Sequence, residues 1–472
     1  MEKLGYVNSF FKLLGYSLAS EKRKEKIRRR RLHDLVMYAK ANSPYFAKVY
    51  AEVGEDFRLE DLPIINKDIM REHFDEWHTV SGITMQKVQE FIRDEANLGK
   101  LYLDKYTIVM TSGSTGKPAV ILQDSSMQNL YGCMAAMRAM KFRFPIVNIC
   151  HDTGFGIDNE SIRHNKGKAS ILNKLVSVVD ACQTESKIVE DVEKIRPKVI
   201  FGYTGVISLL ANEAALGRLH IQPKFIFTSG EYMSEAMRQK IAEAFPTAEV
   251  HSIYGCTEGG SMAYECHYNH FHVNDDWIIL EAVDENNKPV PLGQPSSKLL
   301  LTNLANGVHP LIRYELGDRV VLHQDDCPCG KHSIWIEVDG RSNADLEFQT
   351  AKGTVMVPCM ILFEIFEDLS SSGLCLFDSY QMILKTDQRL EVRLHILPGT
   401  DREEVFRDIR EAVLKYLHTC GIEGCEMYLS DVEPQVNTRT GKVIRIYQEN
   451  GQIGMNRHVV DGKNRQIDTT AR

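Results

Sequence analysis

Short apolar runs alternate with amphipathic helical patterns between residues 105 and 256, and this alternation constrains the fold more than any other feature. The apolar runs predict strands at residues 107–110, 198–201, 225–228 and 249–253. Helical patterns follow the second and third of these runs, and the latter places Met237, Ile241 and Phe245 on one face. Such alternation predicts an α/β sheet covered by helices, in which ligands bind at the loops after the strands.

The segments on either side of this region have different patterns. Residues 1–80 read as a helical segment, whereas residues 278–322 contain short strands separated by Pro, Gly and Asn and predict a β-rich subdomain. The polar stretch 340–345 reads as a hinge, and an α+β pattern follows it. We therefore expect a large N-terminal domain of helix-covered sheets over residues 1–343 and a small α+β domain over residues 344–472.

The composition argues against several classes of protein. A hydrophobic share of 43% and a charged share of 25% are ordinary for a globular protein, and a net charge of −8 gives no general attraction to nucleic acid. The basic run over residues 22–31 is interpreted as a solvated helix face, and no apolar stretch is long enough to span a bilayer. Eleven cysteines, an odd number, indicate a reducing compartment. We expect a cytoplasmic protein with neither a nucleic-acid nor a membrane partner, whose first apolar residues form a docking helix rather than a signal peptide.

A glycine-rich turn follows the first predicted strand. Glycines allow the backbone to approach an anion closely, and hydroxyl and amide groups donate hydrogen bonds to it. The spacing of the glycines differs from that of the P-loop NTPases, and on composition alone an ordinary turn is the alternative. The residues of the turn are Thr111, Ser112, Gly113, Ser114, Thr115, Gly116 and Lys117.

A second motif follows the strand predicted at residues 249–253. Tyr254 offers a ring that stacks on a base, and Thr257 a hydroxyl that meets a phosphate. Glu258 offers a carboxylate for Mg²⁺, which typically binds one or two carboxylates together with substrate phosphates. The alternative is a strand-to-loop turn with a solvated glutamate.

Two further signals lie closer to the C-terminus. Asp318 follows a glycine at a strand start, where a carboxylate can accept hydrogen bonds from two ribose hydroxyls, although a turn aspartate is the alternative. Lys442 follows Thr440 and Gly441, and taken by itself it reads as a surface lysine.

The order and spacing of these motifs along the chain are more specific than any one of them. Together with Ser229-Gly230-Glu231 and Gly340-Arg341, they resemble the acyl-adenylate-forming (AMP-binding) superfamily over about residues 25–450. The N-terminal Asn42-Ser43-Pro44-Tyr45-Phe46 and the later Cys327-Pro328-Cys329-Gly330 are similar to the phenylacetate–CoA ligase branch. Within that branch the chain resembles most the subgroup related to the deazaflavin-coenzyme adenylating synthetase.

The resemblance implies a role for each motif in binding ATP. The glycine-rich turn would cover the β- and γ-phosphates, Thr257 would contact the α-phosphate, and Glu258 would hold Mg²⁺. Lys442 would reach the α-phosphate and the substrate carboxylate from a small C-terminal domain that rotates after adenylation. The remaining nucleotide contacts would come from Ser229, Gly230 and Glu231 beside the adenine, Tyr254 and Gly255 against its face, and Asp318 and Arg341 at the ribose.

The activity that the resemblance implies is activation of a carboxylic acid, aryl by preference, as an acyl-AMP. Transfer to a thiol would follow, either coenzyme A or the phosphopantetheine arm of an acyl carrier protein. Two alternatives stay open at this point: adenylyl transfer to a non-carboxylate acceptor such as a deazaflavin, and a catalytically silent nucleotide-binding protein. The protein would act as a monomer or a homodimer.

A cysteine and histidine set predicts a structural zinc site. Cys266 and His272 are close in sequence, and Cys327 and Cys329 lie in a Pro-Gly turn. Two such pairs make a tetrahedral, closed ligand set, and relatives in the branch carry a similar one. His267 and His270 are competing ligands, and four reduced side chains without metal are the alternative.

Overall fold

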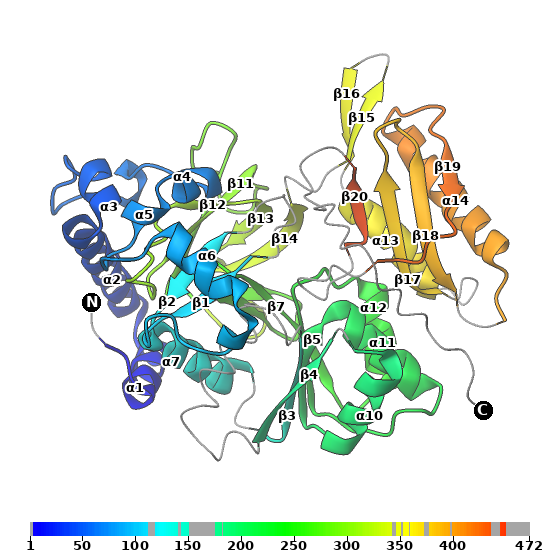
Figure 1. Cartoon of the computed structure of the whole chain (residues 1–472), viewed down its shortest axis with the longest axis horizontal. Coiled ribbons are helices and arrows are strands. Elements are labelled where there is room, and N and C mark those ends of the chain that lie inside the picture. Colours follow the sequence, from blue (N-terminus) through cyan, green and yellow to red (C-terminus); the bar gives the residue numbers. More distant parts are fainter. Residues whose placement is uncertain are drawn as a thin grey trace.

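A nine-stranded mixed sheet runs through the large part of the computed structural model, in the order β13-β14-β9-β8-β7-β6-β5-β3-β4 (Figure 1). The strands from β4 to β7 are parallel, and those from β7 to β13 are antiparallel. Their bounds are β3 Ile146–Cys150, β4 Val176–Asp180, β5 Val199–Tyr203, β6 Phe225–Ser229, β7 Glu249–Cys256, β8 Gly260–Glu265, β9 Phe271–Val273, β13 Asp318–His323 and β14 Trp335–Arg341.

The structure describes residues 3–111, 119–139, 143–150, 175–181, 183–341, 346–350, 353–357, 359–371, 377–396, 399–435 and 444–449. Within these residues, no helix combines the length and the apolar character needed to cross a bilayer.

Three helices connect the parallel strands and cover the sheet. They are α10 Glu185–Ile195, α11 Thr204–Ala215 and α12 Glu235–Ala244. Val192, Ile207 and Ile241, one from each helix, are fully buried and pack in one core with Ile200 and Ile226 of the sheet. The predicted helix-covered α/β sheet is therefore confirmed.

Most of the remaining helices lie in the N-terminal part of the chain, which packs on the antiparallel strands. Its core is aromatic: Trp77 stacks on Tyr45 with a centroid distance of 4.5 Å and donates from Nε1 to the carbonyl of Pro310 at 2.9 Å. The side chain of Asn66 caps the helix that begins at Lys67 by accepting hydrogen bonds from two backbone N–H groups. The bounds are α1 Tyr6–Ser17, α2 Glu21–Asn42, α3 Pro44–Val49, η1 Leu59–Asp61, α4 Lys67–Glu72, α5 Phe74–Trp77, α6 Met85–Arg93, η2 Glu95–Asn97, α7 Ser125–Met134 and η3 Ala135–Ala139.

Two small antiparallel sheets complete the large part. One is the hairpin β1 Thr107–Met110 with β2 Val120–Gln123, and the other joins β10 Ile278–Val283, β11 Lys298–Asn303 and β12 Tyr314–Leu316. The segment predicted as one β-rich subdomain, 278–322, is thus divided, because β13 pairs with β14 and becomes the edge of the nine-stranded sheet.

The C-terminal part is a four-stranded sheet with two helices on it (Figure 1). Its core contains only residues between 346 and 446, including the stacked pair Phe366 and Tyr380. This hydrophobic core is separate from the cores that the earlier residues form. The bounds are β15 Leu346–Thr350, β16 Gly353–Val357, α13 Cys359–Ser371, β17 Phe377–Leu384, β18 Leu390–Ile396, α14 Arg402–Thr419, β19 Met427–Leu429 and β20 Ile446–Gln448.

Candidate functional site

The carboxyl end of β6 carries the residues predicted to border adenine. Ser229 pairs with Ile253 of β7, so both motifs leave the sheet side by side. Gly230 has φ 73°, a left-handed conformation that glycine adopts without strain. The carboxylate of Glu231 accepts a hydrogen bond from the backbone N–H of Gly205 at 2.7 Å, at the start of α11. This end of the parallel strands is where nucleotide sites form in α/β sheets.

Tyr254 and Asp318 come together although 64 positions separate them. The hydroxyl of Tyr254 donates to Oδ2 of Asp318 at 2.7 Å. Asp318 begins β13 and stands opposite Arg341 of β14 in the strand register. The predicted base-stacking ring and the two predicted ribose-binding positions thus lie at one corner of the sheet.

The turn after β7 holds Glu258, which is buried, with 8% of its surface exposed. Tyr314 donates from its hydroxyl to Oε1 of Glu258 at 3.5 Å. Burial, followed by the negative charge of Glu258, raises the pKa of Tyr314, so the phenol stays a proton donor. Thr257 precedes Glu258 and is half-buried in the same turn. The geometry holds the carboxylate of Glu258 inside the turn, with the hydroxyl of Tyr314 as a hydrogen-bond donor to it.

Two residues that the sequence motifs did not indicate, Asn303 and Tyr131, hold the backbone of this turn by hydrogen bonds. Asn303 donates from Nδ2 to the carbonyl of Glu258 at 2.9 Å and to the hydroxyl of Tyr131 at 3.2 Å. Tyr131 in turn donates to the carbonyl of Gly259 at 2.8 Å. Gly260 has φ 64°, and a Cβ there would lie 2.4 Å from the ring of Tyr131. No local pattern marks Tyr131 or Asn303, because each is joined to the turn only by the fold.

The predicted phosphate-binding turn is the connection between β1 and β2. Its base is closed by Thr111, whose N–H donates to the carbonyl of Ala119 at 3.0 Å and whose Oγ1 accepts from the N–H of Ala119 at 2.8 Å. Ser112, Gly113, Ser114, Thr115, Gly116 and Lys117 lie outside the described residues.

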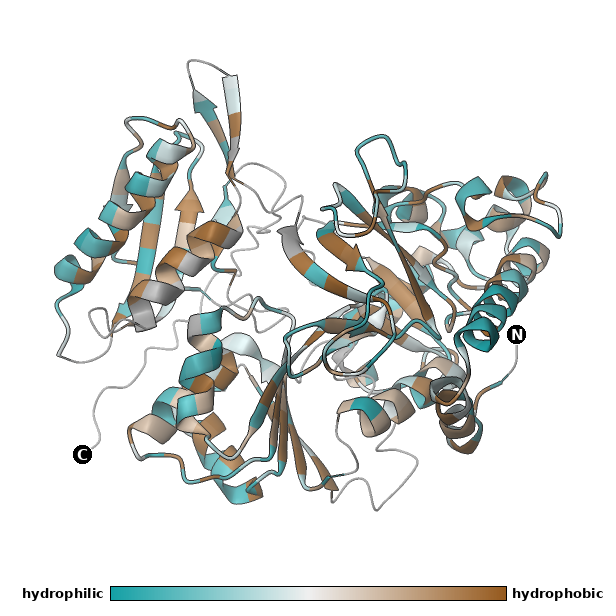
Figure 2. Cartoon of the chain, turned by 180° about the vertical axis from the view of Figure 1, so that it is seen from behind, coloured by the Kyte–Doolittle hydropathy of each residue, from teal (hydrophilic) through white to brown (hydrophobic). Residues whose placement is uncertain are grey.

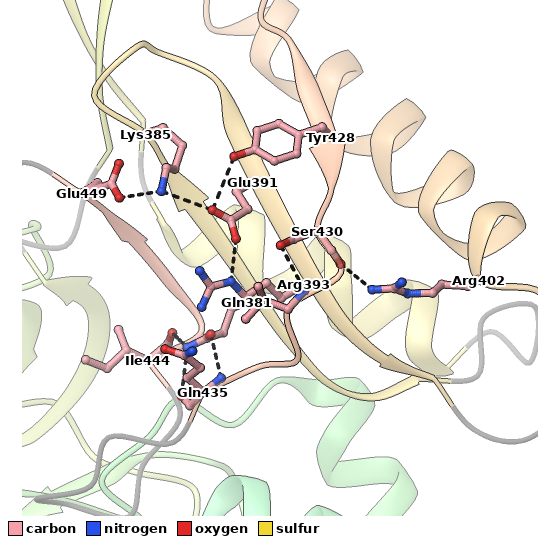
Figure 3. Close-up of polar contacts among 11 residues, drawn as sticks. Gln381, Lys385, Glu391, Arg393, Arg402, Tyr428, Ser430, Gln435, Ile444 and Glu449 are labelled. Carbon is pink, nitrogen blue, oxygen red and sulfur yellow. Dashed lines mark hydrogen bonds and ion pairs between the residues drawn. The ribbon is translucent and has the colours of Figure 1, made fainter. Parts of the chain in front are cut away.

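Lys442 also lies outside the described residues, but the residues on either side of its segment are well held (Figure 3). The buried side chain of Gln381 donates from Nε2 to the carbonyls of Gln435 and Ile444 at 3.1 and 3.0 Å. It also accepts from the N–H of Gln435 at 2.8 Å. One side chain therefore ties together both ends of the segment 436–443.

Arg445 links that segment to the large part of the chain. A Cβ placed on Gly205 would lie 3.1 Å from Nη2 of Arg445 and 3.3 Å from the carboxylate of Glu231. Arg445 is three positions beyond Lys442 in the sequence, and its guanidinium lies beside Gly205 at the start of α11.

The predicted zinc ligands are gathered in one place. The ligand atoms of Cys266, His272, Cys327 and Cys329 all lie within 4.8 Å of one another. Cys266 and His272 come from the β8–β9 hairpin, and the other two from the loop between β13 and β14. The sulfur atoms of Cys266 and Cys327 are 3.8 Å apart, which is close to the roughly 3.8 Å between two thiolates bound tetrahedrally at about 2.3 Å from zinc. The donor set and its spacing fit the ion.

The surroundings distinguish His272 from its two competitors. Its Nε2 lies 3.2 Å from the sulfur of Cys329, and its Nδ1 lies 2.9 Å from the hydroxyl of Ser333, the kind of outer partner that orients ligating histidines. Burial, assisted by the nearby Lys331 and His270, lowers the pKa of His272 to about 4, so its ring is neutral. His270 stacks on Trp335 at 3.8 Å, and its Nδ1 also lies 3.2 Å from the sulfur of Cys327, so this histidine borders the cluster, whereas His267 is exposed.

Residues 85–296 match the AMP-binding enzyme family. A search of curated proteins by sequence gave no match. The matched segment contains the turn at residue 111, the residues predicted to border adenine and the Tyr254–Glu258 motif.

Solved structures of 2-hydroxyisobutyryl-CoA ligase superpose over most of the chain. The postadenylation state, in complex with 2-HIB-AMP, has a TM-score of 0.68 at 18% identity and covers 92% of this chain and 91% of that one. The thioesterification state, with 2-HIB-AMP and CoA, has a TM-score of 0.56 at 18% identity, with coverage of 91% and 90%. An open conformation has a TM-score of 0.54 at 17% identity, with coverage of 91% and 92%. The chain therefore has the fold of adenylate-forming enzymes.

Proposed function

We propose that the protein uses ATP to activate a carboxylic acid as an acyl-AMP, releases pyrophosphate, and passes the acyl group to a thiol. The observation that carries the proposal is the contact between Tyr254 and Asp318, next to the adenine-bordering Ser229 and Gly230. These positions come from separate parts of the sequence, and the fold gathers them at the carboxyl end of the parallel strands, which supports a nucleotide site there.

Different residues would contact the base, the ribose and the phosphates of the nucleotide. Tyr254 would lie against the base while its hydroxyl stays on Asp318, and Asp318 and Arg341 would bind the ribose. Glu258, a single buried carboxylate with Tyr314 as donor, would hold Mg²⁺ together with the phosphates. When bound, this ion would supply positive charge to the phosphate oxygens.

The reaction joins two anions, which explains why the site needs cations. A carboxylate oxygen of the acid bonds to the α-phosphorus, and the bond from that phosphorus to the bridging oxygen of the β-phosphate breaks. Lys442 would lie beside the α-phosphate and the carboxylate and offset the negative charge that grows there. No protein nucleophile is required, because the substrate supplies it.

The second half of the proposal concerns the thiol. The sulfur of coenzyme A or of a carrier-protein phosphopantetheine would attack the acyl carbon, and AMP would leave. The resemblance to the phenylacetate–CoA ligase branch favours an aryl acid. The zinc site would act structurally, since four protein ligands leave no open position for a substrate.

Product analysis tests the acceptor directly. The protein is incubated with ATP, Mg²⁺, an aryl acid and coenzyme A, and the products are separated by mass. We expect AMP, pyrophosphate and an acyl-CoA thioester in equal amounts. Adenylylated deazaflavin with no dependence on a carboxylic acid would instead support the alternative transferase, and ATP binding without turnover would support a silent binding protein.

A further inference from the structure

The solvent-facing side of α1 is apolar. Val7 and Phe11, with Leu18 directly after the helix, are 71%, 63% and 78% exposed. They are the three most exposed large hydrophobic residues in the described part of the chain, where the next, Leu292, reaches 56%. At positions 7, 11 and 18 they share one helix face, and the half-buried Leu14 falls on the same stripe.

The exposure of this stripe does not arise from a loosely attached helix. The opposite side of α1 is buried through Leu13 and Tyr16. Just before the helix, the N–H of Leu4 donates to Ser126 at 3.0 Å, and Nδ2 of Asn129 donates to the carbonyl of Leu4 at 2.9 Å. A helix that is apolar on both sides is normally covered on both sides. One side of α1 already packs against α7, whereas the other side stays exposed among the residues that the structure describes.

A strongly basic helix begins immediately after the stripe. Residues 21–31 contain eight basic and two acidic side chains, although the whole chain has a net charge of −8. Some of these cations bind the protein itself: Arg28 pairs with Asp275 at 2.6 Å, and the guanidinium of Arg31 lies 3.6 Å from the ring centroid of Trp277. The basic residues on the outer side are exposed: Lys22, Arg23, Lys26, Arg29 and Arg30.

The two features adjoin each other in space. Leu18 precedes Lys22 by four positions, and α1 and α2 lie at the same edge of the molecule (Figure 1). Figure 2 shows the hydrophilic surface of α2 beside the more apolar α1. The sequence alone indicated that the basic run is a solvated helix face. In the fold, this run lies next to the apolar stripe of α1, which that interpretation does not include.

We propose that α1 and the start of α2 form a surface that binds an anionic lipid bilayer. The apolar stripe of Val7, Phe11, Leu14 and Leu18 would enter the interface, as interfacial helices do, and the exposed cations of α2 would contact anionic headgroups. This contact is peripheral and requires no membrane-spanning helix.

The positive charge of α2 favours an anionic bilayer over a second copy of the chain as the partner of this surface. A symmetric dimer uses the same patch on both subunits, so it would bring two basic α2 segments against each other. An anionic bilayer would bury the apolar stripe and pair with the cations of α2 at the same time. The phosphates of a nucleic acid would pair with the cations but would leave the apolar stripe exposed.

Vesicle co-sedimentation of the full chain tests the proposal. We expect binding to vesicles of phosphatidylcholine mixed with phosphatidylglycerol, weaker binding at high salt, and little binding to phosphatidylcholine alone. The double variant Phe11→Ser, Leu18→Ser and the triple variant Lys22→Glu, Arg23→Glu, Lys26→Glu should each lower the partition coefficient by more than about tenfold.

Matched controls make the result specific to this surface. Leu216→Ser with Leu292→Ser removes exposed apolar groups elsewhere, and Lys100→Glu, Lys105→Glu, Lys288→Glu makes the same change in net charge; both should bind vesicles like the wild type. Equal melting temperatures exclude misfolding as the cause. The proposal is overturned if the wild type binds neither vesicle, if the variants bind as it does, or if light scattering shows a dimer that the Phe11 variant dissociates.

Discussion

Replacing Lys442 by alanine is expected to slow ATP–pyrophosphate exchange by about 100-fold or more while the protein stays folded. The reason is electrostatic, because the acid carboxylate and the α-phosphate repel each other and the lysine would be the mobile cation between them. The stability should change little, since Gln381 holds Gln435 and Ile444 on either side of the segment without using Lys442. The measurement is radioactive pyrophosphate exchange at saturating ATP, with a melting curve for each variant.

Two further variants separate charge from position. Lys442→Arg keeps the charge but changes its geometry, and should retain part of the exchange activity. Lys415→Ala removes an exposed lysine from α14 in the same part of the chain and should exchange like the wild type. Wild-type exchange by Lys442→Ala would remove this lysine from the mechanism.

Loss of zinc should produce the largest effect on stability. The cluster ties the β8–β9 hairpin to the loop before β14, two segments that are far apart in sequence and meet at the pairing of His272 with Trp335. We expect Cys327→Ala to lower the free energy of unfolding by roughly 3–5 kcal/mol, because metal binding is coupled to folding. The measurements are metal content by mass spectrometry and thermal unfolding with and without a chelator.

The control for this variant is another cysteine. Cys420 is half-buried and stands outside the cluster, so Cys420→Ala should keep both the zinc and most of the stability. A purified wild type that carries no zinc, with a melting curve that a strong chelator leaves unchanged, would show that the four side chains serve without metal.

Local sequence patterns predicted the elements whose apolar residues recur regularly. The strand predicted at 107–110 coincides with β1, and the strand predicted at 225–228 lies within β6. The strands β3 and β4, at one edge of the nine-stranded sheet, were not expected, since a short buried apolar run is ambiguous between helix and strand. The strand predicted at 249–253 continues to Cys256 because it pairs with β8, a contact that alternation along the chain does not reveal.

In the candidate site, too, sequence motifs predicted some residues, whereas other residues and contacts depend on the fold. Motif residues such as Tyr254 and Asp318 were predicted from their spacing, and their hydrogen bond was not, because it depends on how β7 and β13 meet in the fold. Tyr131 and Asn303 support the Glu258 turn only through space and carry no sequence signal. The apolar stripe on α1 likewise became visible only when the fold showed which side of the helix is covered.

The central claim, acyl-adenylate formation, is tested most directly by ATP–pyrophosphate exchange against a panel of aryl and aliphatic acids. The account predicts exchange that requires Mg²⁺ and one class of carboxylic acid, with aryl acids the more active, and no requirement for a thiol. Measurable ATP binding with no exchange for any acid in the panel would contradict it.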